Sequence, residues 1–351
     1  MTLNNKKYNH KIIRLLSINE LEEFQNFIKH NWSRNHIFVL NKLIFNWQHK
    51  GKSDYHFMIA KLNQNIIGVH GIIPLNHFDN NIPDGQIFIT LWRVLENKGI
   101  GIGLLIFQKI LKTYKPNFVA GLPMNSKVSK FYNRFGFECQ TMLHHVALSQ
   151  RKTQFNIAQV PENLKLKKHE TSDKKIFAKL TADSLRKLDT KFLYEHQTPL
   201  KSDSYLINRY LDHPVYKYVI YSLSINILTR LLVVIRPIHI NDTTVLTIVD
   251  YVGSNDDFFL LPDLMYYLLE KYDAEYIDIY SFGIPDENIL KSGLLNVKKT
   301  ESLIIPGLFE PFKKKNMNII CGFYNRGNAA PVRIFKGDSE ADRPTKIENL
   351  N

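Results

Sequence analysis

The chain has 351 residues and a mass of 41.0 kDa, which predicts two domains at roughly 100–200 residues per domain. Its 46 Lys and Arg against 33 Asp and Glu give a net charge of +13, an excess that favours anionic partners such as phosphates, nucleic acid or a membrane surface. The two cysteines, Cys139 and Cys321, lie far apart, which excludes a disulfide scaffold and a four-cysteine zinc site and fits a reducing cytosol.

The first residues, MTLNNKKYNHK, are polar and lack the apolar run and small-residue cleavage site of a secretory signal. No apolar stretch approaches the ~20 residues that a spanning helix needs. We therefore expect a cytoplasmic protein with no membrane span.

The first half of the chain predicts an α/β (α+β) domain. Apolar residues at helical spacing predict a helix over 18–31. Two β-rich runs, 55–62 and 66–75, flank the polar turn 63–65, a pattern typical of a hairpin. The elements expected next are a strand at 87–94, a helix at 104–112, a strand at 118–122 and a helix at 126–135 that Gly136 closes.

The second half repeats this order after a Lys-rich stretch that we interpret as a linker. The division expected is a domain over 1–150, a linker over 151–175, a second domain over 176–335 and a polar, irregular tail over 336–351. The elements expected in the second domain are a helix at 176–188, strands near 217–223, 228–237 and 244–252, a helix at 258–271, a strand at 275–281 and a helix near 286–293.

A glycine-rich turn, Lys98 to Gly103, joins the strand at 87–94 to the helix that follows. Gly99, Gly101 and Gly103 let the backbone fold tightly and let a phosphate approach without a Cβ in the way. Free N–H groups at a helix N-terminus favour an anion there. A plain structural turn is the alternative interpretation. A P-loop is excluded because no Lys-Ser or Lys-Thr follows, and a dinucleotide fingerprint because its last glycine is missing and a hairpin comes first.

The turn resembles motif A of the GNAT (Gcn5-related N-acetyltransferase) superfamily, with Lys98 where the family has Gln or Arg. Lys keeps the charge but loses the planar fork of Arg. Further along, Asn125, Tyr132, Gly136 and Phe137 fall in step with the family's motif B. The resemblance covers about residues 15–150. It implies a GNAT fold with a mixed, splayed sheet and acyl-CoA as co-substrate, followed by a second, degenerate GNAT-like domain that lacks the motif.

The resemblance also implies a cofactor site between the strands at 87–94 and 118–122, where the pantetheine arm would lie like an extra strand. The backbone from Trp92 to Val94 would pair with it, and an N–H there would polarise the thioester carbonyl. Asn125 would bond the pantetheine amides, and the 98–103 turn would hold the pyrophosphate. The cofactor-binding residues expected are Trp92, Val94, Lys98, Gly99, Gly101, Ile102, Gly103, Asn125, Ser129 and Lys130. Lys130 shares a basic helix face with Lys127 and Arg134, for which a solvated face is the alternative.

Tyr132 is the candidate catalytic acid, because a phenol can donate a proton or a strong hydrogen bond to the departing CoA thiolate. The alternative is that Tyr132 only packs. The candidates for the general base are His70, in the second hairpin strand, and Glu96, just after the strand at 87–94. A single strand histidine also commonly has a structural role. No metal is expected, because no His, Cys, Asp or Glu cluster has ligand spacing.

The acceptor expected is the amine of a nucleotide-linked amino-deoxysugar, such as a dTDP- or UDP-sugar. Residues 35–37 and 45–48, with 336–338 and 342–344, look like those of sugar N-acyltransferases from surface-polysaccharide biosynthesis. Another amine acceptor (an aminoglycoside, a polyamine or a cell-wall precursor) is one alternative. The other alternative is a non-enzymatic protein that binds nucleic acid or another anion. Against it, the lysines of this chain are scattered and form no recognised binding motif with interleaved aromatics. We expect a monomer or a homodimer.

Overall fold

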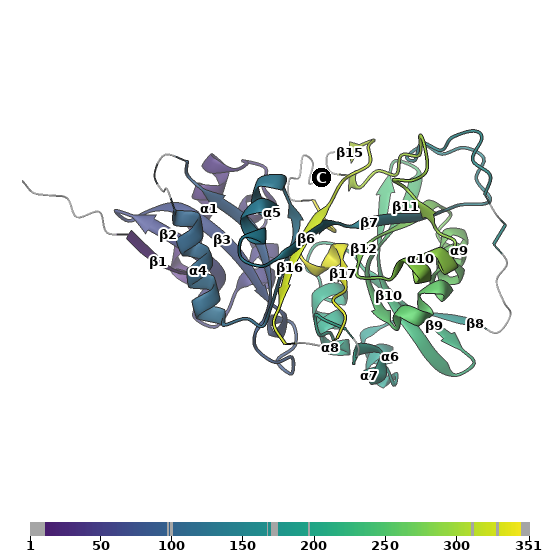
Figure 1. Ribbon diagram of the computed structural model, residues 1–351, viewed down its shortest axis with the longest axis horizontal. Coiled ribbons are helices and arrows are strands. Elements are labelled where there is room, and N and C mark those ends of the chain that lie inside the picture. Colours follow the sequence, from purple (N-terminus) through teal and green to yellow (C-terminus); the bar gives the residue numbers. More distant parts are fainter. Residues whose placement is uncertain are drawn as a thin grey trace, which may run out of the picture.

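The computed structural model describes residues 11–96, 98, 101–166, 168–169, 175–195, 197–309, 312–327 and 330–344. Two mixed β-sheets lie side by side, one built mainly from the first half of the chain and the other mainly from the second (Figure 1). This is the mixed α/β architecture that the sequence predicts. No helix in the described ranges is long and apolar enough to cross a membrane.

The first sheet has the strand order β1-β2-β3-β4-β5-β16-β6. Its first four strands are antiparallel, β4 and β5 are parallel, and β16 runs antiparallel to both β5 and β6. Its strands are β1 (Lys11–Ser17), β2 (Asp54–Leu62), β3 (Asn65–Pro74), β4 (Gln86–Val94), β5 (Phe118–Met124), β16 (Ile320–Asn325) and β6 (Glu138–Thr141). The helices of this half are α1 (Leu21–Asn31), α2 (Ile37–Leu40), α3 (Lys42–His49), α4 (Ile102–Tyr114) and α5 (Ser126–Asn133), with 3-10 turns η1 (Ile18–Glu20) and η2 (Leu75–His77).

The second sheet has the order β13-β7-β12-β11-β10-β9-β8. Its strands are β13 (Leu295–Asn296), β7 (Leu143–Leu148), β12 (Ala274–Phe282), β11 (Thr243–Gly253), β10 (Leu228–Ile240), β9 (Val219–Ile225) and β8 (Lys175–Leu180), and β17 (Ile334–Phe335) pairs with β12. The other elements are α6 (Ala182–Lys187), α7 (Lys191–Tyr194), α8 (Asp203–Leu206), η3 (Ile207–Leu211), η4 (Asn255–Leu260), α9 (Leu261–Lys271), α10 (Asp286–Ser292), the small hairpin β14 (Leu308–Phe309) and β15 (Phe312–Lys313), and η5 (Lys336–Asp338).

The two sheets share one pairing pattern. In each, four antiparallel strands lead through a helical crossover into a parallel strand, β5 in the first sheet and β12 in the second. In each, the next strand is antiparallel and comes from the other half of the chain: β16 joins β5, and β7 joins β12. This repeat supports the predicted duplication. The two halves are interlocked, so the expected division at residues 151–175 does not coincide with the division into sheets.

Three expected features of the second half differ in the structure. The helix expected at 176–188 is strand β8 followed by α6, because β8 pairs along its whole length with β9 and Thr181 caps the helix N-terminus. Part of the expected linker is packed: the Glu275 carboxylate accepts the backbone N–H groups of Ile157 and Ala158 at 3.0 and 3.1 Å. The expected irregular tail is buried as far as Pro344.

The C-terminal segment, residues 333–344, fills the second sheet where β11 and β12 part. The parallel pairing of β11 with β12 stops at Ile248↔Ile279, and β17 then pairs with the end of β12. A Cβ on Gly337 would lie 2.8 Å from the backbone oxygen of Val249, so only glycine fits this close approach. Beside it, Lys201 is paired with two buried carboxylates. The gap in the second half is therefore occupied by the chain itself.

The two carboxylates around Lys201 come from separate parts of the chain. Its Nζ lies 2.5 Å from Asp250 in β11 and 2.8 Å from Asp338 in the C-terminal segment, and all three side chains have 1% or less of their surface exposed. Burial raises the pKa of Asp338 to about 6, against the opposing effect of the lysine. This buried triad ties the C-terminal segment to the second sheet.

Candidate functional site

The first sheet opens between β4 and β5. Their parallel pairing ends at Ile89↔Gly121, although β4 continues to Val94 and β5 to Met124. A cavity of about 430 Å³ lies at this opening, lined by Thr90, Leu91 and Trp92 from β4 and by residues 122–125 on the other side. Unpaired strand edges that face one gap can accept an extended ligand by backbone hydrogen bonds.

Three polar atoms at the cavity are buried without a hydrogen-bond partner among the described residues. They are Nδ1 of His70, Oγ1 of Thr90 and Nε1 of Trp92. All three residues line the cavity. Buried polar groups in proteins are nearly always paired with protein, water or ligand, so this group of atoms indicates a place where a polar ligand binds.

Tyr132 lies in the wall of this cavity, 2% exposed. Its ring packs against Trp92, Phe107 and Phe137, with centroid distances of 5.6, 5.1 and 4.8 Å. Its hydroxyl is hydrogen-bonded with Nε2 of His70 at 3.3 Å. Burial raises the pKa of Tyr132 well above its usual value of 10. The hydroxyl therefore stays protonated and can donate a hydrogen bond.

His70 lies in β3 opposite Trp92, and the two rings stack with centroids 5.0 Å apart. Burial lowers the pKa of His70 to about 3, because the loss of solvation disfavours the charged imidazolium. The ring is therefore neutral and a weak base. It lies beside Tyr132, whose hydroxyl it contacts. Glu96, the other base candidate, is exposed in the turn after β4 and does not line the cavity.

The glycine turn leads into α4, and its glycines differ in surroundings. Gly101 has φ +81°, and a Cβ added there would meet no atom of the described residues within 4 Å, so these residues leave open space beside it. Gly103 instead contacts Trp92, whose Cζ2 would lie 2.7 Å from an added Cβ. Gly103 thus allows Trp92 to pack against α4. Ile102 is buried in the core and Lys98 is exposed, while Gly99 lies outside the described residues.

Asn125 caps α5, and its Oδ1 accepts the backbone N–H groups of Lys127 and Val128 at 3.0 and 2.9 Å. It also lines the cavity, so its amide group remains beside the gap. Ser129 donates its hydroxyl to the Ser126 carbonyl at 3.1 Å. Lys130 is exposed on the same helix. Neither Ser129 nor Lys130 lines the cavity, and Val94 continues the β3–β4 pairing beyond it.

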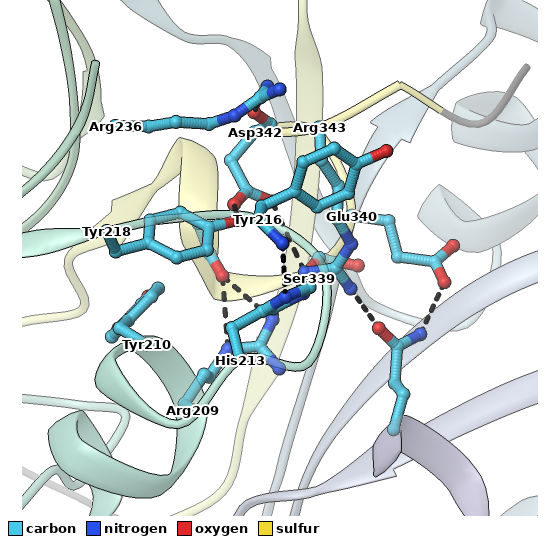
Figure 2. Close-up of polar contacts among 12 residues, drawn as sticks. Arg209, Tyr210, His213, Tyr216, Tyr218, Arg236, Ser339, Glu340, Asp342 and Arg343 are labelled. Atoms are coloured by element: carbon cyan, nitrogen blue, oxygen red, sulfur yellow. Dashed lines mark hydrogen bonds and ion pairs between the residues drawn. The ribbon is translucent and has the colours of Figure 1, made fainter. Parts of the chain in front are cut away.

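The far wall of the cavity includes residues of the segments 35–37 and 342–344, which the sequence indicated only through their resemblance to sugar N-acyltransferases. It also includes Trp32 and Glu340, which the sequence did not single out. The C-terminal segment contributes Glu340, Arg343 and Pro344, and the region after α1 contributes Trp32 and His36. Figure 2 shows Glu340, Asp342 and Arg343 on this segment, between strands of the first half and the helix that carries Arg209. The sequence signal was weak, because a polar stretch near a chain end is typical of a mobile tail.

The corresponding turn of the second half is filled by side chains. Arg333 donates to the Gly253 carbonyl at 2.5 Å and to Asn255 at 3.2 Å, and Asp257 forms an ion pair with Arg230 at 2.6 Å. The side chains of Arg333 and Asp257 therefore occupy this turn. No group of three or more potential metal ligands occurs in the described ranges.

No protein-family model and no curated protein matches this sequence. Solved structures do match its fold. A GCN5-related N-acetyltransferase from Anabaena variabilis aligns with 90% of this chain and 72% of its own, at 12% identity and a TM-score of 0.54. A protein from Enterococcus faecalis described as a probable N-acyltransferase aligns at 11% identity and 0.53, over 89% and 72%, and a GCN5-related N-acetyltransferase from Kribbella flavida at 10% and 0.51, over 90% and 71%. These alignments confirm the predicted GNAT fold across both halves of the chain.

Proposed function

We propose that this protein is an N-acyltransferase that transfers an acyl group from acyl-CoA directly to an amine. The observation that carries the proposal is the opening between β4 and β5 at a cavity whose wall holds the buried Tyr132 hydroxyl. The pantetheine arm would pair with the free edges of the two strands. The open space at Gly101 and the free N–H groups at the start of α4 suit the pyrophosphate.

In this proposal each of the cavity residues has a separate role in the reaction. A backbone N–H of β4 near Trp92 stabilises the carbonyl oxygen as negative charge develops on it. Tyr132 gives its proton to the sulfur as the C–S bond breaks, and His70 orients the phenol. The amide of Asn125 contacts the pantetheine. We also propose that Lys98, Ser129 and Lys130 contact the solvent-exposed part of the CoA molecule.

We further propose a nucleotide-linked amino-deoxysugar as the acceptor. Arg343 and Lys313 line the far side of the cavity and supply cationic groups for a diphosphate. The net charge of +13 also suits a reaction in which both substrates are polyanions. A polyamine or an aminoglycoside would carry several positive charges to this side of the cavity, where Arg343 and Lys313 would repel them.

The test measures acyl-CoA binding by calorimetry, and product formation by thiol release and mass spectrometry. The panel contains several acyl-CoAs with nucleotide amino-sugars, aminoglycosides and polyamines. We expect one CoA site per chain, and weaker binding in Gly101→Asn, because Asn tolerates positive φ but places a side chain in the open space. Absence of CoA binding would refute the acyltransferase proposal. Acylation of polycationic amines only would refute the sugar acceptor.

A further inference from the structure

The cavity contains a buried carboxylate that the motifs do not include. Glu340, 9% exposed, lines the same cavity as His70 and Tyr132. It belongs to the C-terminal segment, which runs from the second sheet to the first. Burying a carboxylate costs free energy unless the carboxylate is hydrogen-bonded. The groups that surround Glu340 therefore indicate its role.

Two groups hold the Glu340 carboxylate in place. Gln48 in α3 donates an Nε2 hydrogen bond to its Oε1 at 2.5 Å, and the backbone N–H of Leu91 also donates to it. Leu91 lies at an irregularity of β4: the β3–β4 register shifts between His70↔Trp92 and Ile72↔Ile89. Thr90 and Leu91 therefore both face Gly71, and such a bulge redirects backbone groups out of the ladder. The carboxylate thus lies against the strand that the thioester would pair with.

The orientation of Gln48 is determined by its neighbours. Its Oε1 accepts from Arg343, and its Nε2 also bonds Nε2 of His49 at 2.9 Å. Nδ1 of His49 lies 3.0 Å from the Ile72 carbonyl and must be the protonated nitrogen, since a carbonyl only accepts. Nε2 of His49 therefore accepts from Gln48, and the amide of Gln48 points its remaining N–H at Glu340. The network presents Glu340 as an acceptor.

We propose that Glu340 is the general base of the reaction, which rests on the acyltransfer proposed above. Its carboxylate takes a proton from the acceptor ammonium, and the free amine attacks the thioester carbonyl. The C–N bond forms and the C–S bond breaks. Tyr132 protonates the leaving thiolate and is reprotonated by the second proton that the amide nitrogen loses. Glu340 then releases its proton to solvent, so the net products are amide, free CoA and one proton.

Other groups around Glu340 do not replace it. Arg343 on its own segment and Arg209 in η3 are cations, and burial lowers the pKa of His49 well below its usual value. His70 is a weak base for the same reason. Burial raises the pKa of Glu340, which makes its carboxylate a stronger base than an exposed one. His36 also lines the cavity and is tested below.

The experiment compares Glu340→Gln and Glu340→Asp with the wild type, using acyl-CoA and the best amine of the panel across pH 5–9. In the wild type, kcat should rise with pH as Glu340 loses its proton. The midpoint of this rise, which is the acid limb of the pH profile, should lie above the ordinary pKa of a Glu side chain. In Glu340→Gln, we expect kcat to fall ~10²–10⁴-fold with the KM for acyl-CoA nearly unchanged. The acid limb of Glu340 should disappear and the remaining rate should follow the free-amine fraction, whereas Glu340→Asp should keep the Glu340 limb at reduced kcat.

Glu138→Gln is the matched control, because Glu138 is an exposed carboxylate in β6 of the same sheet that does not line the cavity, and its kcat and acid limb should be those of the wild type. His36→Gln should retain the acid limb. A Glu340→Gln enzyme with wild-type kcat and acid limb would overturn the base assignment alone. A wild-type protein that binds no CoA and releases no thiol would overturn the proposed function and the base assignment with it.

Discussion

Removing the Tyr132 hydroxyl separates its chemical role from its packing. Tyr132→Phe leaves the ring in its aromatic cluster and deletes one hydrogen bond of 3.3 Å to His70. A neutral hydrogen bond of this kind contributes about 0.5–1.5 kcal/mol to stability, so the melting temperature should fall by no more than about 2–4 °C. A missing general acid costs ~10²–10⁴ in kcat, which is about 3–5 kcal/mol of barrier. The loss of rate should therefore exceed the loss of stability.

The chain contains a control for this substitution. Tyr114 in α4 is also largely buried, and its hydroxyl bonds Nδ1 of His56 at 2.9 Å, but neither residue lines the cavity. Tyr114→Phe should cost similar stability and leave kcat unchanged. Steady-state thiol release at saturating acyl-CoA, measured where chemistry limits turnover, compares the two variants. A near-normal kcat in Tyr132→Phe would show that Tyr132 has only a structural role and would refute its role as the general acid.

Three further outcomes are expected. Gly103→Ala should raise the KM for acyl-CoA and change Trp fluorescence, since its Cβ would come within 2.7 Å of the Trp92 ring; unchanged kinetics would show that the ring is not part of the site. Lys201→Met leaves two buried carboxylates without their cation and should destabilise the fold by about 3–5 kcal/mol in urea unfolding, with earlier proteolysis of the C-terminal segment; wild-type stability would contradict the role given to the triad. Cys139→Ala with Cys321→Ala should remain active, because neither thiol lines the cavity and burial raises both pKa values; a folded but inactive double variant would point to an acyl-enzyme.

Local sequence patterns determined the elements that carry the CoA motifs. The hairpin of β2 and β3, the strand-to-helix turn at Gly101 and the helix α5 (Ser126–Asn133) all lie close to their expected places. They could be predicted because turn glycines, caps and hydrophobic periodicity act over a few residues. Tyr132 and His70 could be proposed, but their contact could not, because it joins positions 62 residues apart.

The tertiary structure decided what depends on long-range contacts. Nothing in residues 143–148 or 320–325 shows that each strand pairs with the other half of the chain, because their partners are set by the open edges of two finished sheets. Strand β8 was mistaken for the start of a helix because its pairing with β9 outweighs a weak local preference. A polar chain end such as 336–344 is expected to be solvated. It is buried because Asp338 meets Lys201 and Glu340 meets Gln48, 137 and 292 positions away, and those contacts exist only in the folded chain.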